Sequence, residues 1–347
     1  MAQPALGLIA TAIIMVISLG FVSSFDSGTF IGWPAFYNLC LIPFQIVAVV
    51  IWGGANPSFV AKLGQPVKGV VMLLVTAVAA GVASMVLLQV VGEGVSPPGP
   101  IPSQFAVICV PTTFFLAIIW GGWPFTNLFK NPIVAGLAML VASYLITYAI
   151  WLVFFDWSYL QGAPVYLQSS PTGMFNGELA LVFYVTALAV MFVILCFDLW
   201  PLTTMPAVMK QPTLGIVFTL LIMVGAAIAV QIGRTVMGAS WNQMVFFTRT
   251  TVPFIFGVII VLNMLQNSLF AKMTQPVKGV MNFIAAAAIG SVLAQLYRML
   301  EPTVTGALVP IPDTLEVWTA NALLSVTFPF LIFYAVYLNY WPLVKQK

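Results

Sequence analysis

The side chain most suited to chemistry in this sequence is Arg249, the one basic residue that lies clearly inside a long apolar run. It belongs to the segment Thr248 to Thr251, about one turn before Pro253. An ionisable group inside the hydrocarbon is energetically expensive and by default marks a functional site. Arginine beside threonine hydroxyls presents several donors, some of them charged. The pattern predicts a mouth that attracts a small anion, with Thr248 and Thr251 beside the charge.

Two simpler interpretations of Arg249 stay open. Near the outer end of a span its guanidinium can extend to the interface, or it can pair with an acid such as Glu178. Glu178 itself fits the first turn of a helix, where the helix dipole favours a carboxylate. Arg234 and Arg298 are the other arginines, and either could add positive charge to the same mouth.

Prolines in the middle of apolar runs form a second group of candidates. Such a proline removes one backbone hydrogen bond and kinks the helix, which is tolerated where a neighbouring helix or water meets the freed carbonyl. Kinks placed around an axis would open a constriction or cavity there; the alternative is that each kink serves packing alone. The prolines are Pro43, Pro111, Pro253 and Pro329, and the residues predicted near the opening are Thr112, Thr113, Phe44, Phe254 and Phe330.

The residues that the sequence lacks count against several classes of chemistry. There is no histidine, which removes the usual haem ligand, the commonest zinc ligand and the usual general base near neutral pH. Cys40, Cys109 and Cys196 lie in apolar runs without a Cys-x-x-Cys pair, so they fit small core residues. No nucleotide loop, paired intramembrane carboxylates or metal-ligand cluster occurs. We therefore expect no enzyme, no metal and no cofactor. The net charge of +3 comes from lysines beside the membrane and suggests no nucleic-acid partner.

Membrane-spanning helices are the elements that must position these residues. Of the 347 residues, 62% are hydrophobic and 5% are charged, whereas soluble domains have about 25% charged residues. In lipid the backbone must satisfy its own hydrogen bonds, so long apolar runs indicate helices. Ten runs have about the length of a spanning helix, at residues 5–23, 33–53, 67–91, 105–122, 132–155, 178–199, 212–233, 246–267, 277–297 and 317–339.

Five of these spans open with the same short phrase, Gln-Pro-x-x-Gly or its variant Asn-Pro-x-x-x-Gly. Proline is favoured at the first helical position because its missing N–H would be unpaired there anyway, so the phrase is interpreted as a helix start. We name the spans that follow it B spans, and the spans that alternate with them, most of which end in aromatic Gly/Pro-rich turns, A spans. The five copies begin at Gln3, Gln65, Asn131, Gln211 and Gln275.

The chain is interpreted as one transmembrane domain, residues 1–347, built from five repeats of a hairpin of one B span and one A span. The hairpins cover about 1–57, 63–128, 130–205, 210–270 and 274–347. All eight lysines fall in the A-to-B turns or the C-terminal tail, and seven of the eight acids fall in or beside the B-to-A loops. Short basic loops stay in the cytoplasm, so we predict a plasma (inner) membrane protein with both termini cytoplasmic.

Hairpins of one orientation are related by rotation about the membrane normal, and five of them would close into a pseudo-symmetric ring. The prolines make the A spans the candidates for an inner ring. The B spans contain runs of small residues, such as 76–84 and 285–291, which allow close helix packing. A pore lined by those small residues stays open as an alternative.

Ten spans, five parallel hairpins, cytoplasmic termini and proline-kinked helices with mid-membrane phenylalanines together resemble the slow anion channel and TehA tellurite-resistance family. The resemblance implies a fivefold pseudo-symmetric ring of kinked inner helices around a phenylalanine-gated anion pore. It covers the whole chain in architecture and involves no shared sequence motif. In that family the inner helix leads each hairpin, whereas here the kinked helix comes second, so no functional residue is carried over.

We therefore expect an all-α integral membrane protein that acts as a channel or facilitator for a small anion or small polar solute. The alternative is a non-transporting membrane subunit that anchors or organises partner proteins. The scarcity of polar residues and an aromatic-rich loop at 156–177 favour that alternative. Expected partners are the lipid bilayer and the solute, with other membrane proteins or further copies of this chain as additional candidates.

Overall fold

Ten helical segments are long and apolar enough to cross a membrane. The computed structural model describes residues 2–306 and 313–344, and all ten segments lie in that part of the chain. They are consistent with the predicted all-α, multi-pass membrane protein. The ten segments are Ala5–Val22, Ser27–Ile51, Val67–Val90, Pro100–Ile119, Pro132–Phe154, Gly177–Cys196, Thr213–Ser240, Gln243–Met264, Val277–Thr305 and Thr314–Tyr337.

The B spans are continuous α-helices that begin at the predicted phrase. Pro132 is the first helical residue of its span, and the prolines of the other four phrases directly precede their helices. These positions follow from chemistry, because proline has no N–H to leave unpaired at a helix start. The B spans are α1 (Ala5–Val22), α5 (Val67–Val90), α8 (Pro132–Phe154), α10 (Thr213–Met237) and α13 (Val277–Thr305).

Four of the five A spans combine α-helix with wider π-helical turns. In three of them the π-helix starts four residues after the predicted proline, at Val47, Phe115 and Phe333. The third A span has Leu188 in place of a proline and remains α-helical throughout. The A spans are α2 (Ser27–Ile31), α3 (Trp33–Ile46) and η1 (Val47–Ile51); α6 (Pro100–Phe114) and η2 (Phe115–Ile119); α9 (Gly177–Cys196); α11 (Gln243–Phe246), η6 (Phe247–Thr251), α12 (Val252–Ile259) and η7 (Ile260–Met264); and α14 (Thr314–Asn321), η8 (Ala322–Thr327), α15 (Phe328–Ile332) and η9 (Phe333–Tyr337).

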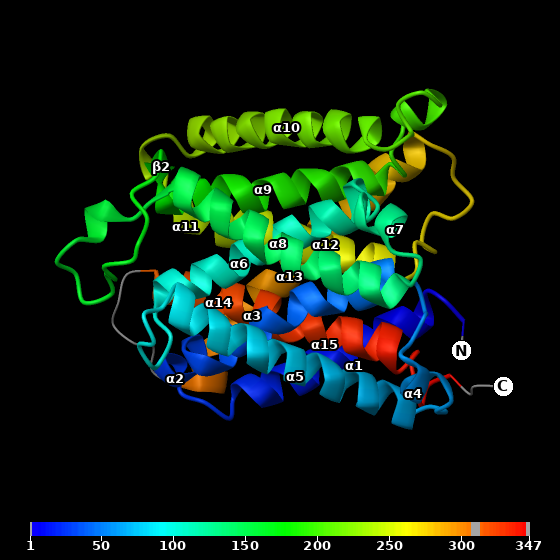
Figure 1. The fold of residues 1–347 in the computed structure, drawn as a ribbon, viewed down its shortest axis with the longest axis horizontal. Helices are drawn as coiled ribbons and strands as arrows, with labels where there is room; N and C mark the ends of the chain where they lie inside the picture. Colours follow the sequence, from blue (N-terminus) through cyan, green and yellow to red (C-terminus); the bar gives the residue numbers. More distant parts are fainter. Residues whose placement is uncertain (1, 307–312, 345–347) are drawn as a thin grey trace.

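Short elements occupy the connections. At one end of the bundle, in Figure 1, lie α4 (Ser58–Ala61) and α7 (Phe125–Leu128), together with both ends of the chain. At the opposite end the loop after α8 contains β1 (Phe155–Asp156) paired in parallel with β2 (Phe175–Asn176). The remaining short helices are η3 (Ser158–Leu160), η4 (Leu202–Thr204) and η5 (Gly238–Ser240).

The A spans form the interior of the bundle. Over an 18-residue stretch of each A span 67% to 78% of the residues are buried, against 28% in the matching stretch of four B spans and 44% in α1. Each A span contacts the next A span along the chain, and α14, η8 and α15 of the last one contact α2 and α3 of the first. The contacts among the A spans therefore form a closed cycle.

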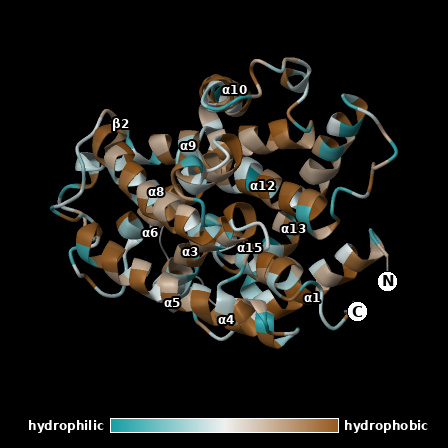
Figure 2. Ribbon diagram, turned by 45° about the vertical axis from the view of Figure 1, so that its right-hand side comes forward, coloured by the Kyte–Doolittle hydropathy of each residue, from teal (hydrophilic) through white to brown (hydrophobic). Residues whose placement is uncertain are grey.

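Each B span lies against two neighbouring A spans on the outside of this cycle. α5 contacts α3 and η9, α8 contacts α6 and η1, α10 contacts α9 and η2, α13 contacts α12 and α9, and α1 contacts η8 and η7. The outward side chains of the B spans are apolar, as lipid contact requires; Val78 and Val292, for example, are 69% and 67% exposed. Figure 2 shows hydrophobic residues along the length of these helices.

The Gln-Pro phrase also ties four B spans to the ends of A spans. Gln65, just before α5, accepts a hydrogen bond from the Gly69 N–H of that helix and donates one to the Tyr337 carbonyl. A Cβ on Gly69 would lie 2.8 Å from that carbonyl oxygen, so glycine permits the close approach. The phrase thus has a second structural role besides starting a helix. The same bridge is made by Gln3 to Met264, by Gln211 to Ile119 and by Gln275 to Cys196.

Candidate functional site

A cavity of about 130 Å³ lies in the middle of the five A spans. Every A span contributes to its wall, which is almost entirely apolar. One wall residue from each span, in chain order, is Gln45, Phe114, Phe192, Asn263 and Phe328. A space reached from all five inner spans is the feature of this fold that most resembles a path through it.

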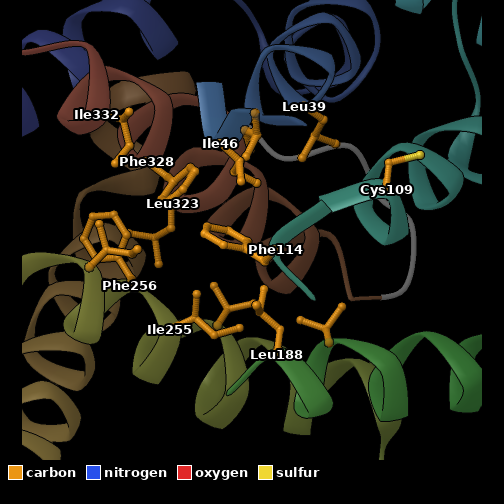
Figure 3. Packing of buried hydrophobic residues seen from close by; sticks show 14 of the residues in the cluster. Leu39, Ile46, Cys109, Phe114, Leu188, Ile255, Phe256, Leu323, Phe328 and Ile332 are labelled. Atoms are coloured by element: carbon orange, nitrogen blue, oxygen red, sulfur yellow. The ribbon is translucent and has the colours of Figure 1, made fainter. Parts of the chain in front are cut away.

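A second cavity, of about 30 Å³, is also lined by all five A spans and shares Phe114 and Phe328 with the first. The rings of these two residues lie edge to face with centroids 6.3 Å apart, and the Phe192 ring lies 5.3 Å from that of Phe114. Figure 3 shows Phe114, Leu188, Ile255 and Phe328 converging on this region from four spans. The phenylalanine rings therefore fill the interior where the two cavities adjoin.

Two amide side chains supply the polar surface of the larger cavity. Gln45 is almost fully buried, and its Nε2 donates to the Pro329 carbonyl oxygen at 3.1 Å. Its Oε1 has no hydrogen-bond partner among the described residues. Asn263 lies on η7 at the same cavity. The walls of both cavities contain no ionisable side chain, so they offer neither a proton relay nor a charged binding group.

The three phenylalanines predicted near the opening face other neighbours. Phe44 packs against Trp52, with ring centroids 5.4 Å apart. Phe254 packs against Phe283 of α13 at 5.2 Å, and Phe330 packs against Phe21 of α1 at 5.6 Å. None of the three lines either central cavity. The residues that do, Phe114, Phe192 and Phe328, were missed by the sequence reasoning.

The predicted prolines are distributed between the interior and the helix contacts. Pro111 lines the smaller cavity, and the Pro329 carbonyl accepts the Gln45 amide described above. The Pro253 carbonyl lies against α13 at Gly290, where a Cβ would lie 1.8 Å from its oxygen. Pro43 is buried inside α3.

Thr112 and Thr113 belong to a buried hydroxyl network that links three spans. Thr112 Oγ1 lies 3.0 Å from the Tyr184 hydroxyl on α9 and accepts from Thr147 Oγ1 on α8 at 2.8 Å. Thr113 Oγ1 donates to Ser143 Oγ, also on α8, at 3.1 Å. Because their hydroxyls are satisfied by protein groups, these threonines act in helix packing.

Arg249 lies at the perimeter of the bundle, apart from the central cavities. Its Nη2 donates to Glu316 Oε1 at 3.1 Å, and Arg298 Nη2 donates to the same oxygen at 2.6 Å. Arg249 therefore pairs with Glu316 of the last A span, and not with Glu178, the acid suggested by the sequence. Of the other two arginines, Arg298 joins this cluster. Arg234 lies over the Trp241 ring, 5.9 Å from its centroid.

The two threonines beside Arg249, Thr248 and Thr251, have different neighbours. Thr248 Oγ1 donates to the Met244 carbonyl at 3.0 Å, and Thr248 lines the same polar groove as Arg249. Thr251 Oγ1 lies 3.3 Å from that of Thr186 on α9. Thr248 thus shares a site with Arg249, whereas Thr251 faces the neighbouring A span.

Comparison with known proteins identifies no relative of this chain, so the function is argued from the geometry alone. No protein-family model, no curated protein and no solved structure matches the chain. Within residues 2–306 and 313–344, no group of three or more metal-ligating side chains gathers.

Proposed function

We propose that this protein is a membrane channel or facilitator that moves a small anion or small polar solute between the five A spans, and that the structure represents its closed state. The observation that carries the proposal is the pair of central cavities, each with walls from all five A spans, which meet at Phe114 and Phe328. An apolar constriction of this kind blocks polar solutes by excluding water, and a modest rotation of its rings restores a wet path.

The proposed architecture is a pseudo-symmetric ring of five parallel hairpins with the A spans inside. The closed cycle of A-span contacts supports it, as do the Gln-mediated bridges that recur in four hairpins. We place the lysine-bearing turns in the cytoplasm by the positive-inside rule, in the inner membrane of the cell. Both termini then lie on the cytoplasmic side.

The wall chemistry favours a solute that is small and weakly hydrated. The larger cavity offers the amides of Gln45 and Asn263, and neither a charge nor a metal-ligating cluster lines it. Amides can donate to an anion or exchange hydrogen bonds with a neutral solute, so both classes remain in the proposal. A strongly hydrated cation is disfavoured, because no carboxylate compensates its dehydration.

Two phenylalanines on one short helix provide the test. Phe328 lines both central cavities, whereas Phe330, two residues later on α15, packs outward on Phe21. The purified chain is reconstituted into liposomes, and the uptake of chloride, nitrate, formate, urea and glycerol is followed for wild type, Phe328→Ala and Phe330→Ala. We expect Phe328→Ala to admit at least one solute several times faster than wild type, and Phe330→Ala to match wild type. The proposal is rejected if no solute crosses the Phe328→Ala liposomes faster than protein-free ones, or if Phe330→Ala raises flux equally.

A second candidate function is a non-transporting subunit that anchors a protein complex. The supporting observation is an apolar slot of about 570 Å³ between α8, α9 and α10, lined by residues such as Phe154, Phe183 and Met223. A slot on the lipid-facing side could receive a helix of another membrane protein. Absence of flux in both phenylalanine variants, with a stable partner retained through purification and lost on Phe183→Trp, would favour this role.

A further inference from the structure

A polar groove opens on the perimeter of the bundle between η6 and α13, separate from the central cavities. We call it the arginine groove; its volume is about 340 Å³, and its walls include Thr248, Arg249, Ser291, Gln295 and Arg298. Ser291, Gln295 and Arg298 recur every three or four residues, so they share one face of α13. Val292 and Met299 of the same helix are 67% and 69% exposed, as lipid contact would require. The groove is therefore a polar interruption in an apolar surface.

The groove carries an excess of positive charge. Arg249 and Arg298 both donate to one oxygen of Glu316, so two guanidinium groups share one carboxylate. Arg298 is largely buried, with 12% of its side chain exposed, and its Nη1 has no hydrogen-bond partner among the described residues. Arg249 is 56% exposed, which leaves further N–H groups free to bind. Glu301, one turn further along α13, is bonded to Thr305 and does not line the groove.

The outer end of the groove lies at the depth of a membrane interface. Lys278 lies at the start of α13 and pairs with Asp198 at the lysine-bearing end of the bundle. Arg298 follows twenty residues later on the same helix, which is about 30 Å at 1.5 Å per residue, close to the thickness of the hydrocarbon core. Arg298 thus lies at the opposite interface, and Gln295 and Ser291 extend the polar wall one to two turns inward.

We propose that the arginine groove binds a phosphate oxyanion, either the phosphodiester of an anionic phospholipid headgroup or free inorganic phosphate. The unpartnered Nη1 of Arg298 and the exposed guanidinium of Arg249 donate to the phosphate oxygens. The Ser291 hydroxyl and the Gln295 amide supply neutral donors beside them. Glu316 fixes both arginines and leaves one net positive charge, which a singly charged phosphodiester neutralises.

Binding is measured on the full chain in phosphatidylcholine nanodiscs. One arm replaces part of the lipid with phosphatidylglycerol; the other adds inorganic phosphate against sodium chloride at equal ionic strength. The thermal unfolding midpoint and bound adducts in native mass spectra are the readouts. We expect saturable stabilisation in one arm, and that arm identifies whether the phosphate comes from lipid or from solution.

Variants then assign the binding to the groove. Arg298→Gln keeps the Arg249 to Glu316 pair and should weaken apparent affinity about tenfold or more, because a charge-assisted hydrogen bond is lost. Ser291→Val with Gln295→Leu leaves the ion pairs intact and should also weaken binding. Arg234→Gln is the matched control, since this arginine lies over Trp241 and outside the groove. The proposal is overturned if neither probe stabilises the protein, if the groove variants bind like wild type, or if Arg234→Gln weakens binding as much.

Discussion

The crossing of α12 and α13 is the packing contact most sensitive to a single added methyl group. A Cβ on Gly290 would lie 1.8 Å from the Pro253 carbonyl oxygen, and one on Gly257 would lie 1.9 Å from that of Ala286. Both obstacles are backbone atoms, so relief requires the helices to separate. Alanine normally stabilises a helix interior relative to glycine by about 0.5–1 kcal/mol. Overpacking costs about 1–3 kcal/mol and occasionally more, and this backbone contact belongs at the upper end. Gly290→Ala should therefore destabilise the protein by about 2 kcal/mol net, or more.

Gly20→Ala in α1 is the matched control, because a Cβ there meets no atom within 4 Å. The same substitution should leave stability unchanged or raise it slightly. Thermal unfolding of both variants and wild type in one detergent, followed by tryptophan fluorescence, compares them directly. A Gly290→Ala midpoint several degrees below wild type is expected. A midpoint equal to that of Gly20→Ala would show that the helices do not cross this closely, and would refute the packing described for α12 and α13.

Two further predictions concern the polar links between spans. Glu316→Ala should lower the free energy of unfolding by about 3–5 kcal/mol, because it leaves the buried Arg298 charge uncompensated. The double variant Glu316→Ala with Arg298→Met should recover most of that loss in the same unfolding assay. Additive losses in the double variant would contradict the pairing. Gln211→Leu should cost about 1–3 kcal/mol through the unpaired Ile119 carbonyl and Gly215 N–H. The control Gln231→Leu, at an exposed position further along α10, should cost less. Equal losses would remove the structural role assigned to the Gln-Pro phrase.

The starts of the B spans could be predicted because proline encodes them directly. α8 begins at Pro132 and α5 begins immediately after Pro66. The apolar run of the last B span ends at residue 297, whereas α13 continues to Thr305. Hydropathy treats Arg298 and Glu301 as loop residues, but Arg298 is compensated by Glu316 from a different span. Such a long-range partner cannot be found from local composition.

The inner faces of the A spans were harder to predict. In three A spans a π-helical turn begins four residues after the proline, and burial supports the A spans as the inner ones. The sequence did not reveal the π-helical turns. Each such turn holds more residues than an α-helical turn, so it changes which of the residues that follow it face inward. Phe328 lines the interior while Phe330 packs on α1, because residues two apart on the α-helix α15 lie on nearly opposite faces. Spacing from a proline alone could not separate the two.

Thiol labelling inside the larger cavity tests the proposed path most directly. Val50 on η1 lines that cavity and is 37% exposed. Val70 lies in the first turn of α5, on the outside of the bundle, and is 45% exposed. The native Cys40, Cys109 and Cys196 are buried and should stay unreactive. In a Phe328→Ala background, labelling Val50→Cys with a membrane-impermeant thiol reagent should abolish solute flux, while labelling Val70→Cys should leave it unchanged. Undiminished flux after complete labelling of Val50→Cys would contradict a conduction path between the A spans.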